Sequence, residues 1–246
     1  MNRYYYDLHM HSCLSPCGDN DMTVCNIAGM AALAGLQIVA LTDHNTCKNC
    51  PAFFAAAKRN GIIPVAGMEL TTAEDIHLLC LFETLEQAMA FDEAVDAHRV
   101  RIPNRTDIFG EQWILDENDR VIGSDPFLLS NATDLTIEAG TALCRATGGV
   151  CWPAPIDREA NGVIAVLGVF PDEPVYTCAE FQDSANVPVF LEQYPNLRNK
   201  RIVCSSDAHY LWQIRDKEAF FELEDEPYSS DSVRHELFKK LRSGKE

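Results

Sequence analysis

Positive charge is scarce in this sequence, which has 20 lysine and arginine residues against 37 aspartate and glutamate residues. The formal net charge of −17 argues against a broad grip on nucleic acid, because that grip needs a positive surface that displaces counterions from the phosphates. A small anionic substrate is not excluded, since a bound metal ion can reverse the local field. We therefore expect no long nucleic acid among the partners.

Long apolar runs are also lacking, and no segment approaches the roughly 20 apolar residues that span a bilayer. The first residues, MNRYYYDLH, contain no hydrophobic signal region. These absences predict a cytoplasmic protein with no membrane partner. In that compartment the ten cysteines are expected to be thiols or metal ligands and not disulfides.

An internal repeat, a low-complexity linker and a GxSxG motif are all missing, so neither a repeat array nor a serine nucleophile elbow is expected. What is present is an alternation of apolar strands with helices. Strands are predicted at 4–8, 36–44, 62–70, 75–82, 148–154, 175–181, 201–209 and 218–224. Helices are predicted at 22–35, 50–61, 85–101 and 229–244, the first capped by Asp21 or Thr23 and ended by Gly35. This order predicts a single α/β domain over residues 1–246, with a mostly parallel sheet in a closed or distorted barrel.

Residues 102–125 interrupt that alternation with a predicted hairpin that turns at Glu117, Asn118 and Asp119. We interpret this segment as an insertion over one end of the barrel. It would serve there as a structural cap or as a substrate lid.

Histidines and carboxylates gather where predicted strands end. His9 and His11 are two residues apart after the first strand, so both point to the same face. Asp43 with His44, Glu69, and Asp207 with His209 end later strands. Because the ends of parallel barrel strands converge on one rim, this pattern predicts a metal centre there.

The motifs DLHMHS, LTDHN, GMEL, HLLCLF and SSDAHY occur in this order and resemble those of the PHP (polymerase and histidinol phosphatase) family. The resemblance implies a distorted (β/α)7 TIM-like barrel that binds two or three divalent ions, such as zinc, manganese or iron, and hydrolyses phosphoesters. It implies a first metal on His9, His11, Glu69 and Asp207, a second on Glu69 and His77, and a third on His44 and His209.

The sequence departs from the family pattern at two places. Pro155 stands where relatives carry a further histidine, so the second metal would lose a protein ligand. After the HxH pair, Cys17 stands near the place of a third-site ligand, with Asp19 or Asp21 as alternatives. Cys17 could also join Cys13, Cys47 and Cys50 in a separate zinc or iron–sulfur site. Our first expectation, however, is that these four cysteines are reactive or merely buried thiols.

The predicted function is that of a metal-dependent phosphatase, a hydrolase that cleaves a small phosphomonoester through a metal-activated water. The substrate would be a nucleotide, a sugar phosphate or histidinol phosphate. Arg158 and Arg105 are the candidate phosphate ligands, and Asp43 or His209 would transfer the leaving-group proton. The alternatives are a phosphodiesterase or 3′-exonuclease on short oligonucleotides, and a catalytically impaired metal-binding regulatory domain.

Overall fold

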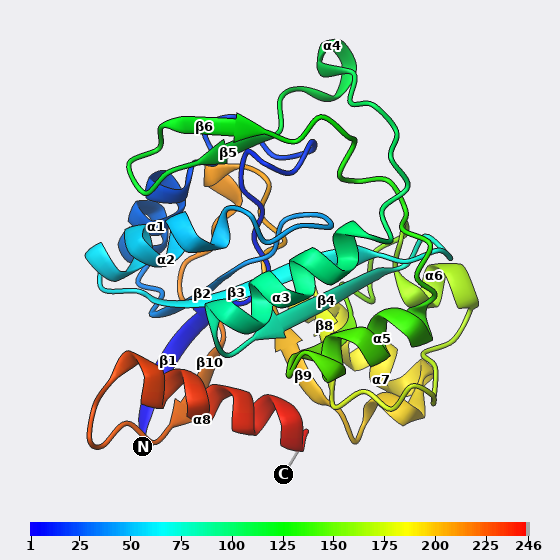
Figure 1. Ribbon diagram of the computed structural model, residues 1–246. Coiled ribbons are helices and arrows are strands. Elements are labelled where there is room, and N and C mark those ends of the chain that lie inside the picture. The colour runs from blue at the N-terminus through cyan, green and yellow to red at the C-terminus, as the bar shows by residue number, and fades with distance from the viewer. Residues whose placement is uncertain (245–246) are drawn as a thin grey trace.

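A computed structural model describes residues 1–244 and shows a curled sheet with helices packed around it (Figure 1). The last two residues of the predicted domain, 245–246, lie outside the described part. The main sheet has the strand order β10-β1-β2-β3-β4-β7, and β8 pairs with β9 in a second sheet. The strands are β1 (Asn2–Asp7), β2 (Ile38–Leu41), β3 (Ile63–Thr71), β4 (His77–Phe82), β7 (Val150–Pro153), β8 (Cys178–Phe181), β9 (Arg201–Cys204) and β10 (Phe220–Leu223).

This arrangement is a mixed α/β fold with a curled half-barrel sheet. The sequence predicted a mostly parallel sheet in a closed or distorted barrel, and the α/β class is confirmed, whereas part of the sheet is antiparallel. β1, β2 and β3 are parallel, but β4 runs antiparallel to both β3 and β7. The physical reason is the connection after β3. Residues 72–76 form a tight turn, whereas a parallel crossover needs a dozen residues or more. The curl is continued by a parallel bridge from Met10 to Ala208, which joins the loops after β1 and β9.

The predicted strands and helices are confirmed, with ends that differ by up to five residues, as in β9 and α3 (Leu85–Asp96). All nine residues of β3 are buried, as expected of a continuous apolar strand that is covered on both faces. The covering helices include α1 (Val24–Leu33), α2 (Cys50–Arg59), α3 (Leu85–Asp96) and α8 (Ser230–Ser243). Of the two predicted caps of α1, Thr23 is the one used, because its side chain accepts a hydrogen bond from the backbone N–H of Asn26.

Besides the short α4 (Thr106–Phe109) in the insertion, the described residues contain three α-helices that were not predicted: α5 (Ile137–Ala146), α6 (Val163–Leu167) and α7 (Val187–Gln193). Gly140 stands in the middle of α5 and lowers its helix propensity. The structure explains this glycine, since a Cβ atom there would lie 2.7 Å from the Leu70 side chain. Close packing of α5 on the sheet therefore outweighs its local preference.

The predicted hairpin is confirmed as β5 (Trp113–Leu115) and β6 (Val121–Ser124), after a short helix α4 (Thr106–Phe109). Figure 1 shows it at the top of the molecule, above the ends of the parallel strands. The Asn49 side chain fixes it there, donating to the Trp113 carbonyl and accepting from the Leu115 N–H. Whether the insertion acts as a cap or a lid stays a prediction. Among the described helices, none has the length and apolarity needed to cross a membrane.

Candidate metal centre

Five histidines and two carboxylates meet at the end of the sheet that the hairpin covers. They form three overlapping groups, in each of which one ligand atom per residue lies within 4.8 Å of the others. We name these groups the Asp207 cluster (His9, His11, Glu69, Asp207), the His77 cluster (His44, Glu69, His77) and the His209 cluster (His11, His44, His209). All the residues that the resemblance assigned to three metals are brought together, apart from Cys17.

His77 reaches this end because of the antiparallel strand. His77 is the first residue of β4. Because β4 runs antiparallel to β3, this residue pairs with Thr71, the last residue of β3, and so lies at the end of the sheet where the parallel strands end. On the expected parallel strand, His77 would have lain at the far end. Its Nδ1 is instead 2.6 Å from Glu69 Oε1.

Glu69 is the shared carboxylate of the site and is fully buried. Its Oε2 lies 3.1 Å from both His11 Nε2 and His44 Nδ1, and its Oε1 is 3.4 Å from His9 Nε2. Asp207 Oδ1 completes the Asp207 cluster, at 3.5 Å from His9 Nε2 and 3.2 Å from His11 Nε2.

The donor atoms fit a group of divalent ions. Among the described residues, Glu69 Oε1 and Oε2, Asp207 Oδ1, His44 Nδ1 and His77 Nδ1 are buried polar atoms without a hydrogen-bond partner. Such atoms carry a desolvation cost unless something compensates them. Imidazole nitrogens and carboxylate oxygens facing one point are the donor set of zinc, manganese and iron sites, so bound ions would satisfy them.

The electrostatics of the site also favour cations. Although burial opposes charge, the neighbouring histidines hold the pKa of Glu69 well below its usual range, so this carboxylate remains ionised. Burial acts on His44 in the other direction and lowers its pKa well below the ordinary value. His44 is therefore neutral and offers a lone pair, as a metal ligand must.

Ser15 and Asp43 hold His11 in its orientation. Ser15 Oγ donates to Asp43 Oδ1 at 2.7 Å and lies 3.0 Å from His11 Nδ1. With the hydroxyl proton used on Asp43, His11 Nδ1–H donates to Ser15, which leaves Nε2 facing the cluster. The Asp43 carboxylate also accepts from the Ser12 backbone and hydroxyl, so it fixes the loop from behind the ligands. Its role as a proton donor stays a prediction.

Glu180 was missed by the sequence analysis. It lies fully buried on β8, where its Oε1 is 2.7 Å from His9 Nδ1 and its Oε2 accepts from the Trp152 indole N–H at 3.1 Å. This contact places the His9 proton on Nδ1 and turns Nε2 to the cluster. The signal was available in CAEF, because a charged residue within an apolar strand needs a buried partner.

Replacing Glu180 by glutamine is expected to weaken the first bound ion by roughly 10- to 100-fold, the usual cost of losing such a supporting partner. Competition with a chelator would measure the affinity. The matched control is Glu222→Gln, which changes an exposed glutamate on β10. An unchanged affinity in Glu180→Gln would show that His9 does not need this carboxylate for its orientation.

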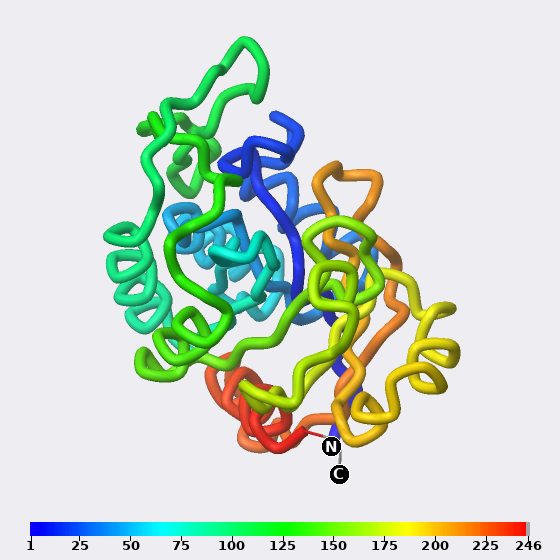
Figure 2. Tube along the Cα trace, turned by 90° about the vertical axis from the view of Figure 1, so that its right-hand side faces the viewer, coloured from blue at the N-terminus to red at the C-terminus, as the bar shows by residue number. Residues whose placement is uncertain are grey.

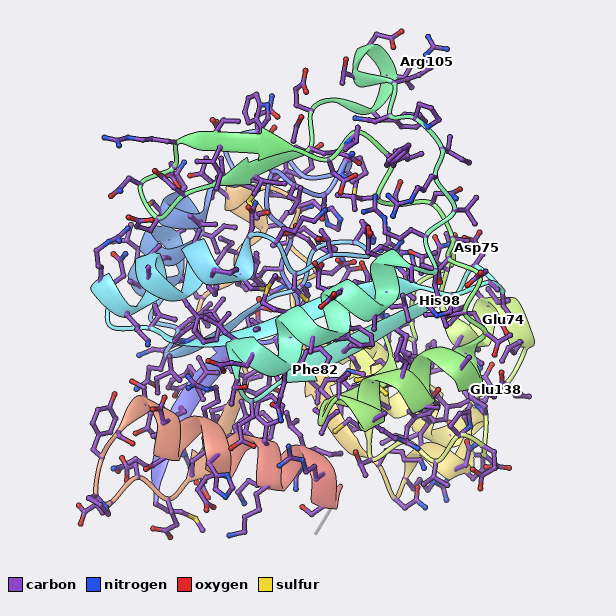
Figure 3. The ribbon with its side chains drawn as sticks, in the orientation of Figure 1. Glu74, Asp75, Phe82, His98, Arg105 and Glu138 are labelled. Atoms are coloured by element: carbon purple, nitrogen blue, oxygen red, sulfur yellow. The ribbon has the colours of Figure 1, made fainter. Side chains whose placement is uncertain are left out.

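The predicted phosphate ligands lie in different places. Arg158 is at the centre, where its Nη1 donates to Asp207 Oδ2 at 2.9 Å. Arg105 is at the outer tip of the insertion, paired with Asp107 and away from the clusters (Figure 3). Pro155 is buried and follows Ala154, whose N–H donates to the His77 carbonyl at 3.1 Å. The proline side chain has no ligand atom to offer a metal beside His77.

Within the described residues, the cysteines form no metal-binding group of their own. The potential metal groups found within residues 1–244 contain histidine, glutamate and aspartate but no cysteine. Cys47 and Cys50 are buried, with their thiols directed at the Gly67 carbonyl, and Cys13 is buried as well. Cys17 is exposed. That Cys17, Asp19 or Asp21 supplies a ligand to the third metal stays a prediction.

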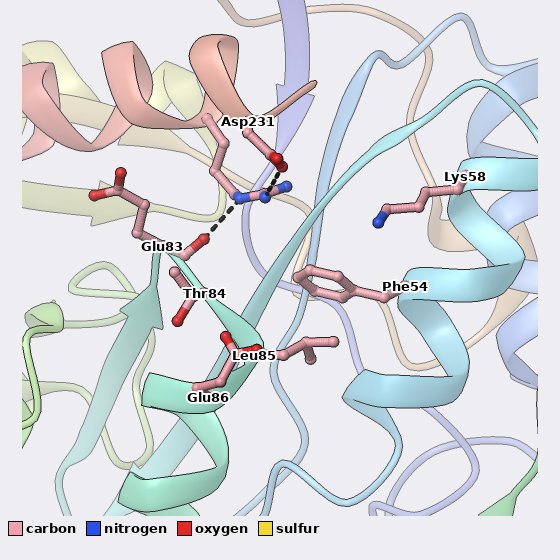
Figure 4. A pocket seen from close by; sticks show the side chains of 8 residues that line it. Phe54, Lys58, Glu83, Thr84, Leu85, Glu86 and Asp231 are labelled. Carbon is pink, nitrogen blue, oxygen red and sulfur yellow. Dashed lines mark hydrogen bonds and ion pairs between the residues drawn. The ribbon is translucent and has the colours of Figure 1, made fainter. Parts of the chain in front are cut away.

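A surface pocket at the opposite end of the molecule has a different character (Figure 4). It lies between α2, the end of β4, the start of α3 and α8, and its lining includes charged residues of both signs, Arg234 among them. The Arg234 guanidinium is already bound to the carbonyls of Glu83 and Pro64 and to the Asp231 carboxylate. This arginine therefore joins α8 to the sheet.

A known protein family shares sequence with the part of the chain that carries most of the metal-cluster residues. Residues 7–122 match the PHP domain family. Error-prone DNA polymerase of Symbiobacterium thermophilum is 36% identical over 77 residues, which are 31% of this chain and 7% of the polymerase. This chain thus spans a small part of that relative.

Solved structures share the fold at low identity. The lesion-specific endonuclease EndoQ from Pyrococcus furiosus has a TM-score of 0.65 at 18% identity, with 98% of this chain and 56% of that chain covered. Endonuclease Q in complex with a 27-mer duplex substrate with an abasic lesion gives 0.62 at 17% identity over 97% and 57% of the two chains. A proposed metal-dependent phosphoesterase from Bifidobacterium adolescentis gives 0.56 at 15% identity over 97% of both chains.

These findings overturn one prediction. A small phosphorylated substrate and no long nucleic acid were expected, but the similar proteins include a DNA polymerase and an endonuclease solved with a duplex substrate. The error came from treating the net charge as a property of the site, where bound cations would dominate the field. Residues 7–122 thus match the PHP domain, and the ordered motifs and the shared fold agree with that match.

Proposed function

We propose that this protein is a metal-dependent phosphodiesterase that cleaves nucleic acid. The observation that carries the proposal is the buried Glu69 carboxylate, which faces histidines of both the Asp207 and the His77 clusters. One carboxylate between two groups of ligands suits a site for adjacent ions, the arrangement used for in-line displacement at phosphorus. The polymerase and endonuclease among the similar proteins support nucleic acid as the substrate.

Each part of the site has a separate task. Ions bound there would activate water and neutralise charge on the phosphate oxygens. Glu180 and Ser15 keep His9 and His11 in the orientation that binds them. Arg158 lies against Asp207, and its planar guanidinium is suited to a phosphate oxygen. His209 Nδ1 contacts the Asp207 carbonyl at 2.8 Å, which leaves Nε2 as the ring nitrogen available to an ion at the His209 cluster.

Arg158→Ala is expected to lower kcat/KM by about 10- to 100-fold, since a hydrogen bond to a charged group contributes roughly 1.5–3 kcal/mol. Steady-state kinetics on an oligonucleotide would measure this loss. Arg105→Ala is the matched control, because this arginine lies at the exposed tip of the insertion. If the two variants lost activity equally, a role for Arg158 at the phosphate would be wrong.

The proposal is tested with end-labelled oligonucleotides and manganese-loaded protein. Single-stranded DNA, intact duplex and duplex with an abasic site are compared, with p-nitrophenyl phosphate as the monoester control. We expect nucleotide release or strand cleavage that requires metal and disappears in His11→Ala. Phosphate release from the monoester alone, or no hydrolysis by a protein that retains its ions, would contradict the proposal.

A further inference from the structure

We propose that Tyr210 and Trp212 form a stacking platform that binds one unpaired nucleobase beside the metal centre. The inference rests on the proposed function and narrows its substrate to a single-stranded, terminal or extruded nucleotide. Tyr210 comes directly after His209, a member of the metal clusters, and Trp212 follows two residues later. They belong to no part of the hydrophobic core.

The two rings already lie in a stacked arrangement. Their centroids are 5.8 Å apart with an interplanar angle of 28°. Tyr210 is 41% exposed and Trp212 is 78% exposed. Tryptophan is highly buried on average, so a ring this open beside a buried polar site needs an explanation. An aromatic face presented to solvent is the feature on which bases stack.

The platform is fixed relative to the metal ligands. The Gln213 side-chain carbonyl accepts from the backbone N–H of His209 at 2.8 Å and of Tyr210 at 3.1 Å. The Asp19 N–H donates to the His209 carbonyl at 2.9 Å, which ties this loop to the one after β1. Figure 2 shows the two loops rising together at one end, the first in dark blue and the second in orange. Little ordering entropy is therefore lost when a ring stacks there.

A nucleobase fits this place better than other occupants. Consecutive Cα atoms are about 3.8 Å apart, so the base of a nucleotide whose phosphate lies at His209 can reach the rings of the next residues. Stacking requires no positive surface and tolerates any sequence. Bases within a duplex present no free face, so the base must be unpaired or extruded.

The binding test compares an oligothymidylate with an oligomer of the same length that has abasic sites throughout, on manganese-loaded protein. We expect Trp212→Ala to weaken the first by about 5- to 100-fold, the usual loss of one stacked base, and to leave the second unchanged. Trp212→Phe should restore most of the affinity. Tyr228→Ala, at an exposed tyrosine before α8, is the control. Equal effects of Trp212→Ala on both oligomers would overturn the platform.

Tryptophan fluorescence gives a readout independent of activity. Among Trp113, Trp152 and Trp212, only Trp212 is largely exposed. Adding oligothymidylate should quench its emission in the native protein and leave emission in Trp212→Phe unchanged. If native protein cleaves oligothymidylate but shows no quenching, the platform is wrong while the proposed function holds. If it neither binds nor cleaves either oligomer, both are wrong.

Discussion

Glu69→Gln is expected to reduce hydrolysis by more than about 100-fold, beyond the range found for partners that merely support a ligand. The physical reason is that both oxygens of Glu69 face histidines of two clusters, so one substitution removes a charge that both sites share. The amide keeps the shape of the side chain, which limits the change to electrostatics. Metal content per chain, measured by elemental analysis after dialysis, should fall together with activity.

Glu138→Gln is the control for this variant. It makes the same chemical change at an exposed glutamate on α5 (Figure 3). We expect its metal content and activity to match those of the native protein. If Glu69→Gln retained its ions and its rate, the shared-carboxylate account of the site would be refuted.

Asp125→Ala is expected to destabilise the protein by about 3–5 kcal/mol, the usual cost of breaking a buried ion pair. The Asp125 carboxylate accepts from Arg99 through both oxygens at 2.9 Å and from Lys48 at 2.8 Å. The side chains of Asp125 and Arg99 are 2% and 5% exposed. Removing the carboxylate leaves Arg99 buried under the insertion with much of its charge uncompensated. Urea unfolding would measure the change.

The pH dependence distinguishes this ion pair from a packing effect. Burial alone would raise the pKa of Asp125, but Arg99 and Lys48 outweigh it and lower that pKa to about 2. Because the pKa is lower in the folded state, its stabilisation is present above about pH 4 and is lost as the pH falls toward 2. The gap between native protein and Asp125→Ala should shrink over that interval. A gap constant with pH would indicate lost packing instead.

Asp134→Ala is the matched control for the buried pair. Asp134 contacts His98 at 2.7 Å, but the two side chains are 66% and 41% exposed. An exposed ion pair contributes about 1 kcal/mol at most. A loss in Asp134→Ala as large as that in Asp125→Ala would show that burial is not what makes the Arg99–Asp125 pair strong.

The sequence predicted local structure well because hydrophobic periodicity and capping residues act over short distances. Thr23, the apolar run of β3 and the turn at Asp119 were all visible in the sequence. The direction of β4 was mispredicted although the sequence held the signal: the strands expected at 62–70 and 75–82 leave four residues between them, too few for a parallel crossover. Gly140 concealed α5 because the reason for this glycine is its close contact with Leu70, which the sequence does not show.

The candidate site was predictable in its residues and less so in its arrangement. Histidines and carboxylates at strand ends carry their chemistry in the sequence, and the structure brings them together. His77 was hard to place without the antiparallel strand. Glu180 was missed because its partner His9 lies 171 positions away in the chain. The nature of the substrate was mispredicted from net charge, which averages over a surface that the substrate does not contact.

The most direct test of the account is anomalous diffraction from crystals of this protein grown with manganese. We predict peaks within coordination distance of Glu69, one beside His9, His11 and Asp207 and another beside His77. The second should be weaker, because Pro155 offers no ligand there. No anomalous peak at Glu69 in manganese-saturated crystals would contradict the account.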